Sequence, residues 1–439
     1  MRRRNGLLRA IAIFTFIAMT VSATAALTSC AEFYDFIEEL DSVKFGTEET
    51  TCEHDGSETN ECLECETDAD GGGNAESASD ASNGDESESA SEDTEEPPYD
   101  GPKVLTYDNV GELSSGKNVV MFVVDRFDEN YYETMIKSVP DYFDRLDGFT
   151  HYNNYTSLYA RTYPAMASLL TGKDHDYLSS GSKKNKLNAF YSDGGGKMGL
   201  LKENGYTINL YTGQGNSYND ASVMADYVDN VSKREGETAY ITSAQKLRER
   251  IDENGFKLVD SKGQFTLIHL YGCHDTSLSV KNRIIVSFDL IYYYIDQMKA
   301  LGVYDDATII ITGDHPAALS DSKMIGSANS SDDGTRVTAM FFKRSGDSGT
   351  PLAYSSAQVS QDELWNTIFE SEGLIHCKSG ESFFDIPEGV DRERRYIFEL
   401  YKNAKNNGLK YNKLIEYKIV GNANLGESWT IEKQTDIVK

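Results

Sequence analysis

NVVMFVVD, residues 118–125, is a continuous apolar run that ends in an acid. Such runs are typical of strands that are buried on both faces of a parallel sheet, with functional side chains after the carboxyl end. Similar runs at 265–270, 307–312 and 337–342 predict three more strands, and helical spacing of apolar residues predicts a helix over 288–301. Strands that alternate with helices predict an α/β fold, a three-layer sandwich with a mainly parallel central sheet.

Composition divides the chain into four parts. Residues 1–29 read as a signal peptide of the lipoprotein type, and 30–100 as a disordered acidic stalk. Residues 101–400 form the predicted folded domain. Residues 401–439 form an extension in which apolar and aromatic residues predict a small C-terminal strand pair.

The net charge of −29 is concentrated in the stalk, where Lys44 is the only base between residues 31 and 100. The rest of the chain is close to neutral. Too few apolar groups are present in the stalk to offset the entropy cost of ordering it, so disorder is expected. Nucleic acid is excluded as a partner, because its binding relies on lysine and arginine to neutralise phosphates.

The N-terminus carries an export signal. Three arginines at 2–4 precede a mostly apolar stretch at 7–27, and LTSC at 27–30 resembles the lipobox of bacterial lipoproteins. In those proteins the cysteine, here Cys30, carries a lipid. The alternative is an uncleaved N-terminal helix, since the stretch is about long enough to span a bilayer. Both alternatives predict the membrane surface as a partner and a place at the outer face of the bacterial cytoplasmic membrane.

Export permits disulfides, so the remaining cysteines have several possible roles. Cys52, Cys62 and Cys65 could bind zinc together with His54, although thiols in a flexible acidic segment more often pair or stay idle. Two further cysteines can pair only if the fold brings them together; they are Cys273 and Cys377.

Four residues at the predicted strand and helix ends could build a divalent-metal site. Asp125 ends the first strand, Asp314 and His315 follow the strand at 307–312, and Thr162 stands where a helix is expected to begin. Ligands collect at the carboxyl ends of strands in such sheets. Carboxylates and an imidazole are suitable metal ligands, and a metal makes a hydroxyl easier to deprotonate. A helix N-terminus adds amide donors for an anion.

These motifs, in this order, resemble the alkaline phosphatase/sulfatase superfamily, in the sulfatase-like branch nearest lipoteichoic acid synthases and phosphoethanolamine transferases. The resemblance covers about residues 117 to 400, so 101–400 is expected to be a sulfatase-like catalytic domain. Four stretches carry the resemblance: 118–125, 140–154 with LDGFTHYNN at its end, 162–172 with LLTG at its end, and 301–315 with GDH at its end.

The resemblance implies a role for each residue that matches a family position. Asp125, Thr162, Asp314 and His315 fall on metal-ligand positions, with Thr162 also the nucleophile. His274 falls where the family keeps a substrate-facing histidine, and is expected to stabilise an oxyanion or to protonate the leaving group. One divalent metal ion is expected, and Mn, Mg and Zn all remain open.

His269 has no role in that assignment. It lies inside an apolar strand, and the expected interpretation is a core histidine with satisfied hydrogen bonds. The role of Arg126 stays open between a substrate phosphate contact and a solvent or salt-bridge role.

Departures from the family pattern narrow the chemistry. Sulfatases need Cys or Ser at the nucleophile position, which is converted to formylglycine, and an Arg four residues later; here these positions are Thr162 and Met166. Two-zinc phosphodiesterases carry Asp four residues before the conserved histidine, and here that residue is Leu270. One metal with a threonine nucleophile is the arrangement of transferases that act on lipid phosphodiesters.

The predicted function is an extracytoplasmic metal-dependent phosphotransferase or phosphodiesterase that forms a phospho-threonyl intermediate on Thr162. Its expected substrates are lipid or glycan phosphoesters of the cell surface. Two alternatives remain: a sulfatase-like sulfuric ester hydrolase, and a catalytically inactive surface-binding member of the same fold.

Overall fold

The protein is described by a computed structural model over residues 103–176, 188–192, 194–212, 218, 221–232, 244–275, 277–317, 337–403 and 410–438. All of these residues belong to one compact unit, Asp93–Lys439, while the other unit, Met1–Glu92, lies outside the described residues. The predicted signal peptide, the stalk and four cysteines therefore lie outside the description: Cys30, Cys52, Cys62 and Cys65. Within the described residues, no helix has the length and apolar character needed to cross a membrane.

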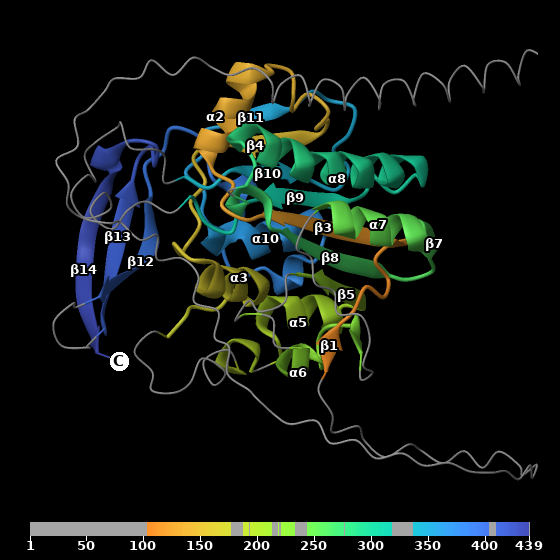
Figure 1. Ribbon diagram of the computed structural model, residues 1–439, viewed down its shortest axis with the longest axis horizontal. Helices are drawn as coiled ribbons and strands as arrows, with labels where there is room; N and C mark the ends of the chain where they lie inside the picture. The colour runs from red at the N-terminus through yellow and green to blue at the C-terminus, as the bar shows by residue number, and fades with distance from the viewer. Residues whose placement is uncertain are drawn as a thin grey trace, which may run out of the picture. The chain divides into compact units, whose positions relative to one another are not determined.

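A seven-stranded sheet forms the centre of the domain, in the order β11-β4-β10-β9-β3-β8-β5 (Figure 1). The four strands β9, β3, β8 and β5 are parallel, and β10 runs antiparallel to both of its neighbours. The predicted α/β class with a mainly parallel sheet is therefore confirmed. The strand bounds are β3 Lys117–Val124, β4 Phe149–Tyr152, β5 Tyr206–Tyr211, β8 Gly263–Leu270, β9 Thr308–Thr312, β10 Met340–Lys343 and β11 Ala353–Ser355.

Helices cover both faces of this sheet. On one face, Phe122 of β3 meets Tyr294 of α8 (Val280–Ala300) edge to face, with ring centroids 5.5 Å apart. On the other face, Phe265 of β8 stacks on Trp365 of α10 (Gln361–Ser371), with centroids 5.8 Å apart. Phe265 pairs with Val119, whose side chain points away from that of Phe122, since alternate residues of a strand face opposite sides. The domain thus has three layers.

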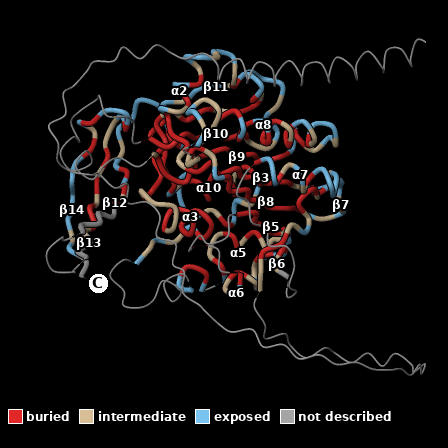
Figure 2. Tube along the Cα trace, viewed as in Figure 1, coloured by how far each residue is buried: buried red, intermediate tan, exposed pale blue. Residues whose placement is uncertain are grey.

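The central strands are almost fully buried (Figure 2). Every residue of β8 and β9 is buried, as is all of β3 after Lys117. Burial of each large apolar side chain contributes about 1.5–3 kcal/mol relative to exposure, so these strands contribute substantially to stability. Burial also keeps water away from polar side chains at the strand ends.

The predicted elements mostly agree with the structure. β3, β8 and β9 begin and end within two residues of the predicted runs. α8 begins eight residues earlier than expected, because the hydroxyl of Ser279 accepts a hydrogen bond from the backbone N–H of Asn282 and caps the helix there. α3 (Thr162–Thr171) begins at the expected threonine and ends at Gly172, whose φ of 67° is left-handed.

Three antiparallel strands form a separate C-terminal sheet, seen at the left of Figure 1: β12 (Glu393–Asn403), β13 (Lys410–Val420) and β14 (Trp429–Val438). β13 and β14 are the predicted strand pair. β12 was not predicted, and it runs across residue 400, so the boundary predicted there falls inside a strand. Aromatic and aliphatic side chains of this sheet form a buried cluster with Val337 of the main domain.

The remaining elements connect these layers. Two small two-stranded sheets pair β1 with β6 and β2 with β7. α2 and α7 pack on α8, while α5 packs on α3. The bounds are β1 Val104–Leu105, β2 Glu112–Ser114, α2 Glu129–Ser138, α5 Gly196–Glu203, α6 Ala221–Met224, β6 Val231–Ser232, α7 Ala244–Asn254 and β7 Lys257–Val259, with short 3-10 turns η1 Gly272–His274, η2 Ile375–Cys377, η3 Phe383–Asp385 and η4 Gly426–Ser428.

Candidate metal centre

Three neighbouring strands bring a potential ligand group together. Asp125 directly follows β3, His269 is the second-last residue of β8, and Asp314 comes two residues after β9. One ligand atom from each residue lies within 4.8 Å of the other two, and all three residues are buried. Two of these residues, Asp125 and Asp314, were predicted metal ligands.

The strand register explains why these three residues lie close together. His269 of β8 and Thr312 of β9 both pair with Val123, so the three chains run side by side where they approach the sheet edge. Gly313 then lets the chains approach closely, since a Cβ atom at this position would lie 2.3 Å from the backbone oxygen of Phe127. The next residue after this glycine is Asp314.

Several ligand atoms in the group have no hydrogen-bond partner. Oδ1 of Asp125, Nε2 of His269 and Oδ2 of Asp314 are buried and unsatisfied. A buried polar atom without a partner costs about 1–3 kcal/mol, and more if it is charged, so three at one point require an explanation. Oxygen and imidazole nitrogen are ligands for Zn, Mn and Mg, and the residues therefore fit a divalent ion.

Spacing gives a second test of the fit. Nε2 of His269 lies 3.8 Å from Oδ2 of Asp125, and Nε2 of His315 lies 3.4 Å from Oδ2 of Asp314. Two ligands that are each about 2.1 Å from one ion cannot be more than about 4.2 Å apart. Both distances fall within that limit, so each of these two pairs is close enough to bind one ion.

The electrostatics of the group depend on its two carboxylates. Burial, and then the neighbouring charge of Asp314, raise the pKa of Asp125 well above its ordinary value. Burial alone would raise the pKa of Asp314 too, but the imidazoles of His315 and His269 outweigh it and lower that pKa. Burial lowers the pKa of His269 to about 4, so its ring is neutral at pH 7 and has a lone pair available.

Thr162 and His315 form a pair beside this group. The hydroxyl oxygen of Thr162 lies 3.2 Å from Nε2 of His315, and Nδ1 of the same ring lies 2.7 Å from the backbone oxygen of Pro316. Because that carbonyl can only accept, Nδ1 carries the proton and Nε2 presents its lone pair to Thr162. The four residues predicted as ligands are therefore gathered around Asp314.

Thr162 is the first residue of α3, so its hydroxyl stands at the amino end of a helix. The first N–H groups of a helix have no partner within the helix, and they favour anions such as phosphate. Pro164 is tolerated in this first turn because a proline there sacrifices no internal hydrogen bond. A half-buried hydroxyl is thus held between a metal-ligand group and an anion-favouring backbone.

Arg126 adopts a left-handed backbone conformation with φ 62° immediately after Asp125. This conformation costs a non-glycine residue on the order of 1–3 kcal/mol. It turns the backbone N–H of Arg126 toward Oδ1 of Asp314, at 3.0 Å, and the N–H of His315 reaches the same oxygen at 2.9 Å. These bonds fix the Asp314 carboxylate with its other oxygen, Oδ2, toward the group.

His269 corrects one sequence-based interpretation. The residue is buried, but it is not a satisfied core histidine, because Nε2 has no hydrogen-bond partner and belongs to the ligand group. A polar residue near the carboxyl end of an otherwise apolar strand was the available signal. This signal was not enough to predict the role of His269, because the sequence does not show the strand register that places His269 beside Val123.

The other predicted residues have mixed outcomes. His274 lies in η1, just after β8, and its charge contributes to lowering the pKa of His269. Its catalytic role stays a prediction. Cys273 and Cys377 are both buried and free, so no disulfide joins them.

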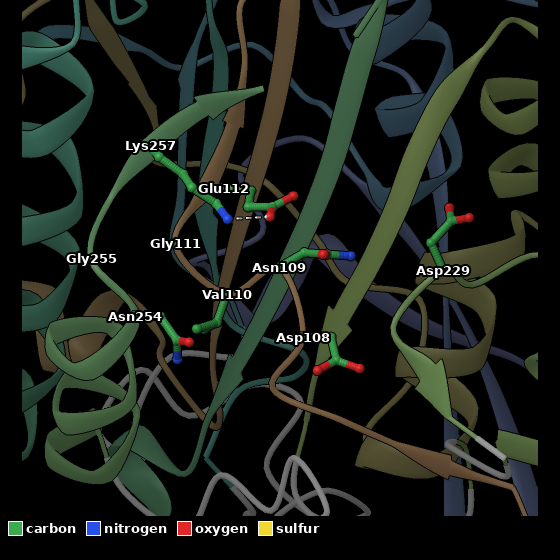
Figure 3. Close-up of a pocket in the computed structure, with 9 residues that line it drawn as sticks. All are labelled: Asp108, Asn109, Val110, Gly111, Glu112, Asp229, Asn254, Gly255 and Lys257. Atoms are coloured by element: carbon green, nitrogen blue, oxygen red, sulfur yellow. Dashed lines mark ion pairs between the residues drawn. The ribbon is translucent and has the colours of Figure 1, made fainter. Parts of the chain in front are cut away.

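A polar surface cavity of about 430 Å³ lies away from this group (Figure 3). Residues of the β2–β7 pair line it, and these two strands come just before β3 and β8 in the chain. Across the cavity, an ion pair of 2.9 Å joins Lys257 and Glu112. None of its lining residues belongs to the ligand group; they are Asp108, Asn109, Val110, Gly111, Glu112, Asp229, Asn254, Gly255 and Lys257.

No protein family and no curated protein matches the chain. Solved structures of similar fold include the lipoteichoic acid synthase LtaP from Listeria monocytogenes, with 13% identity, 75% of this chain and 90% of that chain covered, and a TM-score of 0.45. The C-terminal periplasmic domain of EcEptC from Escherichia coli has 14% identity, coverage of 60% and 86%, and a TM-score of 0.41.

A protein in the alkaline phosphatase superfamily from Vibrio parahaemolyticus is also similar, with 13% identity, coverage of 74% and 83%, and a TM-score of 0.43. This is the superfamily that the motifs resemble. Identities and scores this low transfer no activity, so the function of the chain has to follow from its own residues.

Proposed function

We propose that the chain is an extracytoplasmic, metal-dependent phosphotransferase or phosphodiesterase that forms a phospho-threonyl intermediate on Thr162. One observation carries this proposal. Three buried ligand atoms without hydrogen-bond partners converge at the carboxyl ends of β3, β8 and β9, and a threonine hydroxyl at a helix amino end lies beside them.

Asp125, Asp314 and His315 would hold the ion together with the hydroxyl of Thr162. We add His269 to that set, because it lies in one buried group with Asp125 and Asp314. A bound divalent ion stabilises a deprotonated hydroxyl and the negative charge that builds up on phosphate oxygens. The hydroxyl oxygen of Thr162 lies 3.2 Å from Nε2 of His315. An ion held by these residues would favour loss of the Thr162 hydroxyl proton.

Thr162 Oγ1 attacks phosphorus in line. A phosphorus–oxygen bond to Thr162 forms while the bond to the leaving alcohol breaks, and the leaving alkoxide takes a proton, for which His274 is the proposed donor. A second alcohol, or water, then attacks the phosphothreonine and regenerates the hydroxyl. An alcohol as acceptor makes the chain a transferase, and water makes it a hydrolase.

The proposed substrates are lipid or glycan phosphodiesters of the cell surface. The export signal and the lipobox-like stretch at 27–30 support this, through a tether at lipidated Cys30 or at an N-terminal helix. A threonine at the nucleophile position cannot become formylglycine, which argues against sulfate esters. The carboxylate-lined site also lacks the arginine that sulfatases keep four residues later, where this chain has Met166.

Turnover of bis-nitrophenyl phosphate and of phosphatidylglycerol by the full-length protein, with Mn, Mg or Zn added, tests the proposal. We expect metal-dependent product release and a phosphate adduct in the intact mass, both lost in Thr162→Ala. Thr171→Ala is the matched control, because Thr171 lies at the far end of the same helix and donates its hydroxyl to the Ala167 carbonyl.

A folded wild-type protein that shows no adduct and no turnover with any of these metals would favour the surface-binding alternative. Equal turnover by Thr162→Ala would exclude this residue as the nucleophile even if the site binds metal. Hydrolysis of a nitrophenyl sulfate in preference to the phosphodiester would favour the sulfatase-like alternative.

A further inference from the structure

Tyr218 is a fully buried tyrosine behind the metal centre. Its side chain is 0% exposed, and its hydroxyl oxygen lies within hydrogen-bonding distance of Nδ1 of His269. The two rings are 5.7 Å apart between centroids. Nε2, the other nitrogen of the same imidazole, is the atom that faces Asp125 and has no hydrogen-bond partner.

The hydroxyl of Tyr218 has a second hydrogen-bond partner. It forms a hydrogen bond with the side chain of Thr212, a buried residue just after β5. A short chain of polar groups therefore runs from Thr212 through Tyr218 to His269. Each hydroxyl in it can donate one hydrogen and can also accept one, so the direction of the chain is not fixed by its atoms alone.

Only one direction suits an ion. If Tyr218 donated to Nδ1, the imidazole proton would sit on Nε2 and point into the ligand group, where it would exclude a cation. If instead Nδ1–H donates to Tyr218 and Tyr218 donates to Thr212, Nε2 presents a lone pair to the group. A metal-bound histidine commonly donates its other ring N–H in this way to an outer partner.

We propose that Tyr218, supported by Thr212, is a positioning residue that holds His269 in the Nδ1–H tautomer and makes Nε2 a ligand of the divalent ion. Tyr218 touches neither the ion nor the substrate in this role. This inference rests on the proposed metal-dependent function, but it can fail while that function stands.

The test is metal binding to the full-length protein without substrate. Removing an outer partner of a metal ligand weakens binding by about 10–100-fold. We expect Tyr218→Phe to weaken Mn²⁺ and Zn²⁺ binding, measured by titration calorimetry, by about tenfold or more. Tyr211→Phe is the matched control: Tyr211 is equally buried on β5, but its hydroxyl donates to the backbone oxygen of Asp108, at 2.8 Å, and its loss should leave binding unchanged.

Variants of Thr212 distinguish a role of Tyr218 in setting the His269 tautomer from a role in packing alone. Thr212→Val keeps both Tyr218 and His269 but removes the acceptor for the tyrosine hydrogen, so the chain can reverse and affinity should fall. Thr212→Ser restores the acceptor and should restore affinity. A packing role for Tyr218 alone predicts no loss in Thr212→Val.

Histidine ¹⁵N spectra of the zinc-loaded protein, assigned with His269→Gln, read the tautomer directly. We expect the proton on Nδ1 and a metal-shifted Nε2 in the wild type. A proton on Nε2, or unchanged affinity in both Tyr218→Phe and Thr212→Val, would overturn the inference while leaving the metal site intact. A wild-type protein that binds neither Mn²⁺ nor Zn²⁺ would overturn the inference and the proposed metal-dependent function together.

Discussion

Asp128 is a buried carboxyl group that joins the start of α2 to the chain beyond the metal centre. Oδ1 accepts hydrogen bonds from the backbone N–H groups of Asn130, at 3.0 Å, and Tyr131, at 3.2 Å, while Oδ2 accepts from Ala317 at 3.0 Å. The three bonds favour the ionised form, but burial outweighs them and raises the pKa of Asp128 to about 7. The metal-free domain therefore holds this carboxyl group partly protonated near neutral pH.

A raised folded-state pKa makes stability fall with rising pH. The unfolded chain releases this proton near pH 4, so the contribution to stability is complete below that pH and is lost as the pH rises to about 7. We expect the free energy of unfolding in EDTA to fall when the pH is raised from 5 to 8. The fall should be about 3 kcal/mol smaller in Asp128→Asn than in the wild type. Urea unfolding at both pH values measures this, with Asp144→Asn, an exposed carboxylate, as the control.

If the free energy of unfolding fell as steeply with pH in Asp128→Asn as in the wild type, another group would be responsible for the pH dependence. The same would follow if Asp144→Asn changed the slope by a similar amount.

At the level of elements, β12 holds the chain segment that leads to Thr162, the proposed nucleophile. The backbone N–H of Ile397 donates to the oxygen of Leu158, at 2.8 Å, and its oxygen accepts from Ala160, at 3.2 Å. Thr162 follows two residues after Ala160. The C-terminal sheet is therefore part of the support of the site.

Arg394 fastens that sheet to the main domain. The guanidinium is buried and donates to the backbone oxygen and Oδ1 of Asn154 and to the backbone oxygen of Gly421. Arg394→Met leaves these acceptors without their donors, and we expect it to lower the free energy of unfolding by about 2–4 kcal/mol. The measurement is denaturant unfolding followed by fluorescence.

Lys418→Met is the matched control from the next strand, since its ion pair with Glu393, at 3.0 Å, is solvent-exposed and contributes little to stability. Equal losses in the two variants would contradict the anchoring role of Arg394.

Sequence predicted the elements that carry a continuous apolar run, and it did less well elsewhere. β3, β8 and β9 were found because burial on both faces leaves an unbroken signature. β5 was missed: in YTINLY, Thr207 and Asn209 interrupt the apolar run of this edge strand. The antiparallel direction of β10 could not be predicted either, because the composition of a strand does not fix its direction in the sheet.

The site was predicted in the same uneven way. Asp125, Asp314 and His315 could be proposed because each directly ends a strand or follows one closely. The contribution of His269 depends on the register between β8 and β3, and that of Tyr218 on a contact between distant segments. Neither relation is encoded in local residue patterns.

At the level of the whole molecule, the ion is expected to be a source of stability. The metal-free site places two carboxylates and an imidazole together with three unsatisfied atoms. A ligand present at about 100 times its Kd adds about 2.7 kcal/mol to the folded state. We expect saturating Mn²⁺ or Zn²⁺ to raise Tm by several degrees in differential scanning calorimetry, and EDTA to reverse it.

The Asp125→Asn variant distinguishes stabilisation by metal binding at this site from a general effect of added salt. Without metal it should unfold at a Tm equal to or above that of the wild type, since it removes a carboxylate whose ionised form is opposed by burial and by Asp314. It should lose the metal-induced rise. Asp260→Asn, on the surface, should keep that rise. An undiminished rise in Asp125→Asn would place the ion elsewhere.

The candidate ligand residues come from segments that are far apart in the chain, at the carboxyl ends of three adjacent strands. No partly folded segment contains a complete set, so the ion has nothing to bind until the sheet has assembled. An ion that binds only the completed sheet leaves the folding rate unchanged and slows unfolding, because it stabilises contacts that are absent from the transition state. An ion bound at this centre would thereby give the domain kinetic resistance to unfolding, measurable as a slower unfolding rate when metal is present.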